Sequence, residues 1–141
     1  MATKERLVVI GNGMAGARFV EELLARKGRE RFDIVMFGDE PYGNYNRILL
    51  SGVLAGSHEP KEIFLNPLQW YDENGITLHA GVRVESVDRS LRTVHTAQGF
   101  EESYDRLVFA TGAKPFIPPI LGLAETGHFK EGIYLFRTLD D

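Results

Sequence analysis

The chain has 141 residues, of which 43% are hydrophobic and 26% are charged, with a formal net charge of -4. This size suits one domain with a hydrophobic core, and the acidic balance argues against nucleic-acid and membrane partners. No apolar run is long enough to span a membrane, and no signal-peptide core precedes the first predicted strand, so we expect a cytoplasmic protein.

The start of the chain has the pattern of a dinucleotide-binding turn. Four consecutive apolar residues predict a buried strand over residues 7–10. A Gly-x-Gly-x-x-Gly pattern follows over residues 11–16, and apolar residues at helical spacing then predict a helix over residues 17–27. A strand before the glycines and a helix after them are the context in which this pattern binds a dinucleotide. The alternative is a turn in an α/β domain that binds nothing.

Each glycine of this pattern has an expected role. Gly11 permits a tight turn, Gly13 lets the backbone approach a pyrophosphate, and Gly16 lets the helix lie close to the strand. Free N–H groups at the start of the helix would face the phosphate charges. We therefore include Met14 and Ala15, which lie between the last two glycines, among the expected cofactor-binding residues.

A second strand is predicted over residues 32–37, and acidic residues follow it. An acid about 20 positions after the glycines typically accepts hydrogen bonds from the ribose hydroxyls of the adenosine half. Asp39 is the first candidate, because it comes first after the strand, and Glu40 is the second. The alternative is that both acids lie in a solvated turn.

The middle of the chain predicts helices and one short strand. The expected elements are a loop over 42–47, a helix over 47–54, a helix from Asn66 to Gly75 and a strand over 76–79. Asn66 is expected as the N-cap of the second helix, with Pro67 at its first helical position. Arg47 lies near the sheet edge, where its guanidinium could pair with a pyrophosphate, although a surface arginine is the alternative.

From Val82 onward the apolar period changes to two, which predicts an antiparallel meander up to Tyr104. A further buried strand is predicted over residues 106–110, and it ends in the sequence Ala110, Thr111 and Gly112. The carboxyl ends of parallel strands are the edge where open α/β sheets bind ligands, so small residues there leave room for a cofactor. The fold class expected is α/β, with a Rossmann-like parallel sheet and an antiparallel β-meander.

The last part of the chain is expected to be less regular. Residues 114–123 contain three prolines and predict an irregular connector. A last strand is predicted over 133–136, and residues 138–141 have the pattern of a helix start. A helix that begins at the final residues suggests a segment of a longer protein, truncated before its next domain.

Metal and thiol chemistry are not expected. The sequence contains no cysteine, which excludes disulfides and a redox-active dithiol, and its four histidines have no ligand spacing. No residue is assigned a catalytic role.

Two segments resemble the FAD domain of the pyridine-nucleotide flavoprotein oxidoreductases: residues 8–16 and residues 104–115. The meander between them is that family's FAD-domain pattern and favours FAD over a plain NAD domain. Residues 37–41 and 45–51 are similar to the N-terminal part of the large subunit of NAD(P)H-dependent nitrite reductases. Together these similarities cover nearly the whole chain, so we expect residues 1–141 to form an FAD-binding domain.

The resemblance implies roles for individual residues. The three glycines would hold the pyrophosphate, Asp39 with Glu40 the adenosine ribose, and Arg47 a phosphate or the flavin side. Val84 would meet the adenine through its backbone, and Thr111 and Gly112 would close the site. Relatives similar to rubredoxin reductase have a lysine near the flavin where this chain has Gly52, so no residue is assigned to the flavin ring.

The resemblance also implies a function. The full-length protein would pass electrons from NAD(P)H through FAD to an acceptor, for which nitrite is the expectation, and its remaining domains would be the partners of this one. The segment alone is expected to be inactive, because the NAD domain and the iron–sulfur and sirohaem regions lie outside it. The alternatives are a non-catalytic nucleotide-binding fragment and an NAD-dependent dehydrogenase domain.

Overall fold

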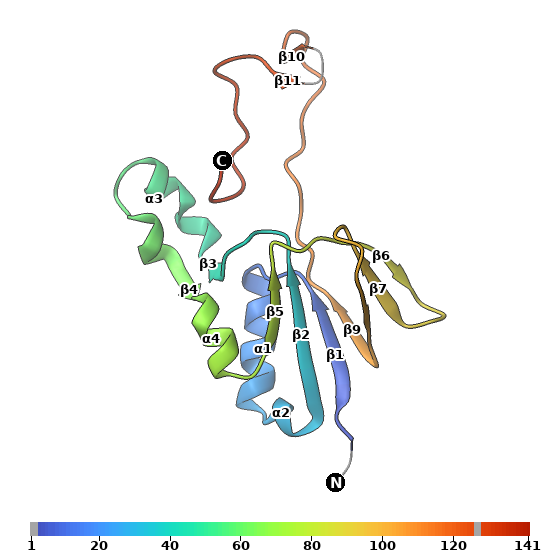
Figure 1. Ribbon diagram of the computed structural model, residues 1–141. Coiled ribbons are helices and arrows are strands. Elements are labelled where there is room, and N and C mark those ends of the chain that lie inside the picture. Colours follow the sequence, from blue (N-terminus) through green and yellow to red (C-terminus); the bar gives the residue numbers. More distant parts are fainter. Residues whose placement is uncertain (1–2, 126–127) are drawn as a thin grey trace.

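A parallel sheet forms the centre of the molecule (Figure 1). The computed structural model describes residues 3–125 and 128–141. The strand order is β5-β2-β1-β9, and every neighbouring pair is parallel. The strands are β1 (Glu5–Ile10), β2 (Phe32–Gly38), β5 (Thr77–Ala80) and β9 (Arg106–Phe109). The consecutive apolar residues of β1 and β2 fit strands that are covered on both faces.

Two layers cover the sheet. Helix α1 (Met14–Ala25) packs on one face, and the antiparallel meander packs on the other. The meander consists of β6 (Val84–Asp88), β7 (Thr93–Thr96) and β8 (Glu101–Ser103). Alternate residues of β1 enter the two cores, so that Val9 meets Val20 of α1 whereas Val8 lies in the cluster that holds Val94 of β7. Both faces of the sheet therefore bury apolar side chains. Burying a large apolar side chain contributes about 1.5–3 kcal/mol to the free energy of unfolding.

Short elements fill the connections. They are α2 (Gly28–Arg31), β3 (Asn44–Tyr45), η1 (Arg47–Leu49), α3 (Leu50–Leu54), η2 (Pro60–Ile63), β4 (Phe64–Asn66) and α4 (Leu68–Glu73). Strands β3 and β4 pair antiparallel, and a third apolar cluster forms around Tyr45, Leu50 and Ile63. This unit lies beside the sheet and holds the segment that follows β2 in place.

The parallel sheet, the meander and the irregular connector agree with the sequence-based prediction, whereas several local predictions are wrong. The strand predicted as buried over 106–110 is β9, which ends at Phe109 and is only partly buried because it lies at the edge of the sheet. Helix α1 begins at Met14, earlier than expected, and the predicted helix over 47–54 is divided into η1 and α3. Pro67, rather than Asn66, is the N-cap of α4. Asn66 instead ends β4, where its side chain accepts a hydrogen bond from Asn44 and donates one to Glu21. These side-chain partners, distant in sequence, replace the expected capping bond.

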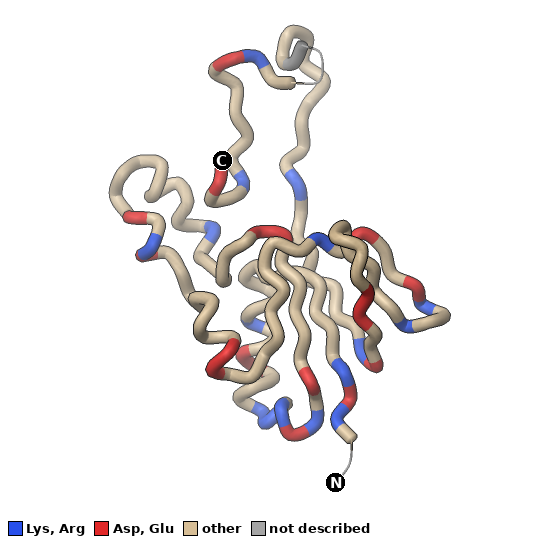
Figure 2. Tube along the Cα trace, viewed as in Figure 1, with Lys and Arg blue, Asp and Glu red and all other residues tan. Residues whose placement is uncertain are grey.

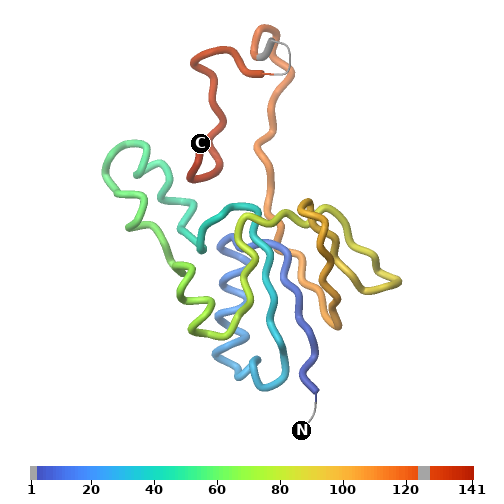
Figure 3. Tube along the Cα trace, in the orientation of Figure 1, coloured from blue at the N-terminus to red at the C-terminus, as the bar shows by residue number. Residues whose placement is uncertain are grey.

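The C-terminal segment extends away from the sheet after β9 and returns toward β3 (Figures 1 and 3). It includes β10 (Ala124–Glu125) and β11 (His128–Phe129), which pair antiparallel. The predictions of a strand over 133–136 and a helix start over 138–141 are wrong. In the described structure no strand pairs with residues 133–136. The carboxylate of Asp141 accepts the backbone N–H groups of Arg137 and Thr138, which closes a turn instead of opening a helix.

Charged residues of both signs are interspersed over the body of the molecule (Figure 2). Within residues 3–125 and 128–141, no group of histidine and acidic side chains could hold a metal ion. In the same described residues, no helix has the length and apolar character needed to cross a membrane.

Candidate dinucleotide-binding site

Two glycines of the Gly-x-Gly-x-x-Gly pattern, Gly11 before α1 and Gly16 within it, are required by the packing of the protein itself. Gly11 has a φ of +114°, and a Cβ added there would lie 2.1 Å from the carbonyl oxygen of Ala110. A Cβ added at Gly16 would lie 2.1 Å from the carbonyl oxygen of Gly11. These distances are far inside van der Waals contact, so larger residues would push α1 away from β1 and β9.

Gly13 differs from both of these glycines. Its φ is -77°, which any residue can adopt, and no heavy atom lies within 4 Å of an added Cβ. Among the glycines that the structure describes, Gly13 alone has neither a left-handed φ nor a neighbour in that range. The fold therefore gives no reason for a glycine here, and the space beside it is open.

The first turn of α1 presents free N–H groups at this open space. Gly13 is the N-cap, and the first helical bond runs from the Ala17 N–H to the Gly13 carbonyl. The N–H groups of Met14 and Ala15 therefore have no helical acceptor. No acidic side chain lies in the first turn of α1, so its positive end is not neutralised from within the helix. This arrangement suits an anion.

The other expected residues gather at the same edge of the sheet. Asp39 follows β2 directly, and its carboxylate forms an ion pair of 2.8 Å with Arg83. Val84 begins β6, and the backbone just before it is tied to the end of β2 by a bond from Val82 N–H to the Gly38 carbonyl. Both candidates for the adenosine half thus lie at the carboxyl end of β2.

Glu40 and Arg47 have other partners in this structure. Glu40 accepts a hydrogen bond of 2.5 Å from the Tyr45 hydroxyl and pairs with Arg47 at 2.7 Å. Arg47 also donates to the backbone carbonyl of Arg137. Burial, and then the bond to the Glu40 carboxylate, raise the pKa of the Tyr45 hydroxyl above its usual value. We call Glu40, Tyr45 and Arg47 the Glu40 cluster.

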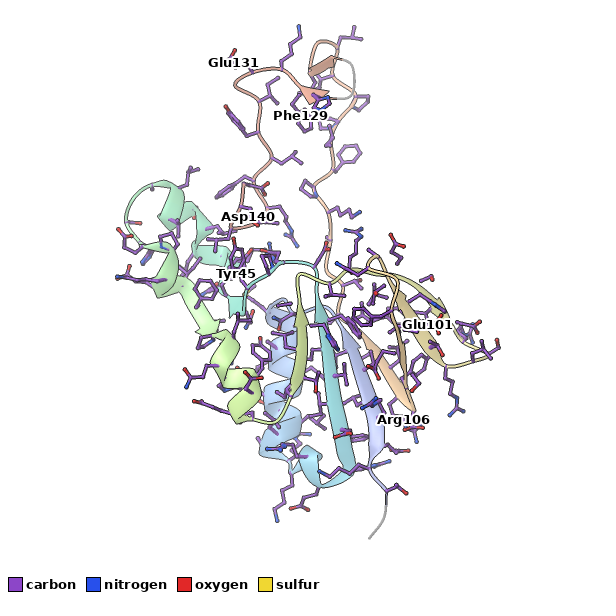
Figure 4. All side chains as sticks on the ribbon, in the orientation of Figure 1. Tyr45, Glu101, Arg106, Phe129, Glu131 and Asp140 are labelled. Carbon is purple, nitrogen blue, oxygen red and sulfur yellow. The ribbon has the colours of Figure 1, made fainter. Side chains whose placement is uncertain are left out.

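The Glu40 cluster also holds the C-terminal segment. The Leu139 N–H donates to the Tyr45 hydroxyl at 3.1 Å, and the Tyr42 hydroxyl donates to Asp140 at 2.5 Å. Figure 4 shows Tyr45 and Asp140 near each other, where the returning segment meets the body of the molecule. Residues nearly 100 positions apart in sequence are therefore joined beside the carboxyl edge of the sheet.

Comparison with known proteins assigns the chain to a family. Its sequence matches the pyridine nucleotide-disulphide oxidoreductases over residues 5–141. The chain belongs to this family. It is 49% identical over 138 residues to the assimilatory nitrate reductase electron transfer subunit of Bacillus subtilis (strain 168), covering 98% of this chain and 17% of that protein. It is 46% identical over 138 residues to the nitrite reductase [NAD(P)H] of the same strain, covering 98% of this chain and 16% of that protein.

A solved structure agrees with this assignment. The crystal structure of a covalent putidaredoxin reductase–putidaredoxin complex has a TM-score of 0.75 and 28% identity, covering 84% of this chain and 28% of that chain. These findings confirm the predicted α/β fold and the predicted resemblance to nitrite reductases of the oxidoreductase family. The chain spans 16–17% of the length of the two curated relatives.

Arg137 is a candidate residue that the sequence did not indicate. Its Nη2 atom lies 3.9 Å from the position of a Cβ added at Gly112, beside the expected Ala-Thr-Gly edge. Within the described residues its guanidinium has no hydrogen bond and no ion pair, although the residue is half-buried. Arg137 comes 25 positions after Gly112, and only the return of the C-terminal segment brings the two together. No local pattern marks it.

Proposed function

We propose that this member of the oxidoreductase family binds FAD at the carboxyl edge of its parallel sheet. The observation that supports the proposal best is the open glycine, Gly13, at the N-terminus of α1. A pyrophosphate lying against the backbone accounts for a glycine that the fold itself does not need. The family match and the NAD(P)H-dependent relative support a redox cofactor of this kind.

The residues at this edge fit the parts of FAD. The free N–H groups of Met14 and Ala15, with the cationic Arg137, would hold the pyrophosphate. Asp39 would accept the ribose hydroxyls, and the backbone of Val84 would meet the adenine. FAD supplies the electron-accepting and electron-donating chemistry when it is bound, and the protein residues bind and orient it.

The wider proposal concerns the whole protein. We infer that this domain passes electrons from NAD(P)H toward an acceptor, for which nitrite is proposed because a relative 46% identical to the chain is a nitrite reductase. Regions beyond this segment would supply the nicotinamide site and the site of the acceptor. The proposed setting is a soluble, cytoplasmic enzyme.

The test of FAD binding is the substitution Gly13→Val. The branched side chain would occupy the open space beside the helix start, so FAD affinity should fall by orders of magnitude while the fold is kept. Ala25→Val, at the exposed far end of α1, is the control and should leave FAD affinity unchanged. The measurements are FAD titration by flavin fluorescence and thermal unfolding. If Gly13→Val binds FAD as tightly as the parent, the pyrophosphate assignment is wrong.

A second expectation is that the FAD-loaded segment does not oxidise NADH at an enzymatic rate. Holding the nicotinamide against the flavin can supply about 7–11 kcal/mol of the barrier, and the sequence has one glycine fingerprint, which FAD would occupy. Flavin bleaching after anaerobic mixing with NADH should therefore be slow and should increase linearly with NADH concentration. Fast bleaching that saturates with NADH would reveal a nicotinamide site that this proposal does not include.

A further inference from the structure

We propose that Arg83 is a positioning residue that orients the Asp39 carboxylate toward the ribose hydroxyls of the adenosine half. This inference rests on the proposed FAD site. The Nη1 atom of Arg83 lies 2.8 Å from Oδ2 of Asp39, and both residues are exposed at the carboxyl edge of the sheet. A carboxylate has about four acceptor positions, so a bond to one arginine leaves others for hydroxyl donors.

The backbone on both sides of this pair is fixed. The Gly81 N–H donates to the Glu40 carbonyl at 3.0 Å, just after Asp39. The Ala97 N–H donates to the Arg83 carbonyl at 2.8 Å, which ties Arg83 to the residue that follows β7 in the meander. Arg83 and Asp39 therefore approach each other from two anchored segments, and the ion pair restricts the remaining side-chain freedom of the carboxylate.

Stability alone does not account for the pair. The two side chains are 47% and 63% exposed, and exposed ion pairs contribute little to the free energy of unfolding. Arg83 directly precedes Val84, the residue expected beside the adenine. Its position thus suits orientation of the adenosine half better than support of the fold.

The experiment compares two probes, ADP and 2′,3′-dideoxy-ADP, which lacks both ribose hydroxyls. Calorimetric titration of the 141-residue chain should show tighter binding of ADP. In Arg83→Gln, ADP affinity should fall about 3- to 5-fold, the upper range for an exposed ion pair, while dideoxy-ADP affinity should not change. Arg83→Lys should retain part of the preference for ADP over dideoxy-ADP, because lysine keeps the positive charge but lacks the planar guanidinium.

Arg89→Gln is the matched control, since Arg89 is an exposed arginine of the same meander and the substitution makes the same change of charge. It should leave the preference for ADP over dideoxy-ADP intact.

An equal loss of affinity for both probes in Arg83→Gln would show a general charge effect and overturn the positioning role. An unchanged preference for ADP in Arg83→Gln would overturn it as well. If the parent binds neither FAD nor ADP, the proposed FAD site fails and this inference fails with it. If the parent binds FAD and Arg83→Gln keeps the parent's preference for ADP, the inference about Arg83 fails and the proposed FAD site stands.

Discussion

Asp39 and Glu40 are neighbours at the end of β2, and each pairs with an arginine, yet their surroundings differ. The Asp39–Arg83 side chains are 63% and 47% exposed, whereas both members of the Glu40–Arg47 pair are 23% exposed. Tyr45 adds a buried hydroxyl to the second pair. One acid therefore keeps acceptor positions open to a ligand, and the other is committed to joining parts of the chain. On their burial and surrounding contacts, which differ although both residues are acids, we propose Asp39 rather than Glu40 as the ribose partner.

The largest expected effect is on FAD affinity. Asp39→Ala should weaken FAD binding roughly 10- to 100-fold, because it removes charge-assisted hydrogen bonds of about 1.5–3 kcal/mol. Its free energy of unfolding should change by about 1 kcal/mol at most, since its ion pair is exposed. Flavin-fluorescence titration and urea unfolding measure the two quantities. A larger loss of FAD affinity in Glu40→Ala than in Asp39→Ala would reverse the order of the two acids.

Glu40→Ala should show the opposite pattern, with its main effect on stability. The substitution leaves the half-buried Arg47 without its carboxylate and the Tyr45 hydroxyl without an acceptor, which costs about 1–3 kcal/mol. Urea unfolding should therefore show a lower midpoint than in Asp39→Ala. Equal midpoints for the two variants would mean that the Glu40 cluster does not stabilise the fold more than the exposed pair does.

A smaller change in the free energy of unfolding should appear at alkaline pH. Burial and the bond to Glu40 raise the pKa of Tyr45 in the folded state above its usual value of 10.0. The stability that this shift provides is fully present below pH 10.0 and is lost as the pH rises through the folded pKa, because the unfolded state then releases its proton first. Urea unfolding at increasing pH should show this loss.

Tyr45→Phe provides the control for the alkaline effect. Tyr42 and Tyr71 also have raised pKa values, so part of the decline of stability with rising pH should remain in this variant. The decline should nevertheless be shallower than in the parent. Identical slopes would exclude Tyr45 from the alkaline transition.

Features determined by local sequence could be predicted, and those that depend on distant contacts could not. The glycine turn and the strand before it follow from a short run of residues, and the period of two around Val84 identified the meander. Asn66 has the residue type of an N-cap, but Asn44 and Glu21 bind its side chain. Nothing near Arg137 indicates that it lies beside Gly112, because the return of the C-terminal segment determines that approach.

The single tryptophan gives the glycine turn a built-in optical probe. Trp70 packs edge-on against Tyr71, with ring centroids 5.0 Å apart. The Tyr71 hydroxyl donates at 2.6 Å to Oδ1 of Asn12, the residue between the first two glycines of the turn. One aromatic side chain thus separates the indole from the proposed pyrophosphate-binding backbone. A flavin bound at the proposed site would quench the tryptophan emission by energy transfer, so this emission would report loading and release of the cofactor without an attached label.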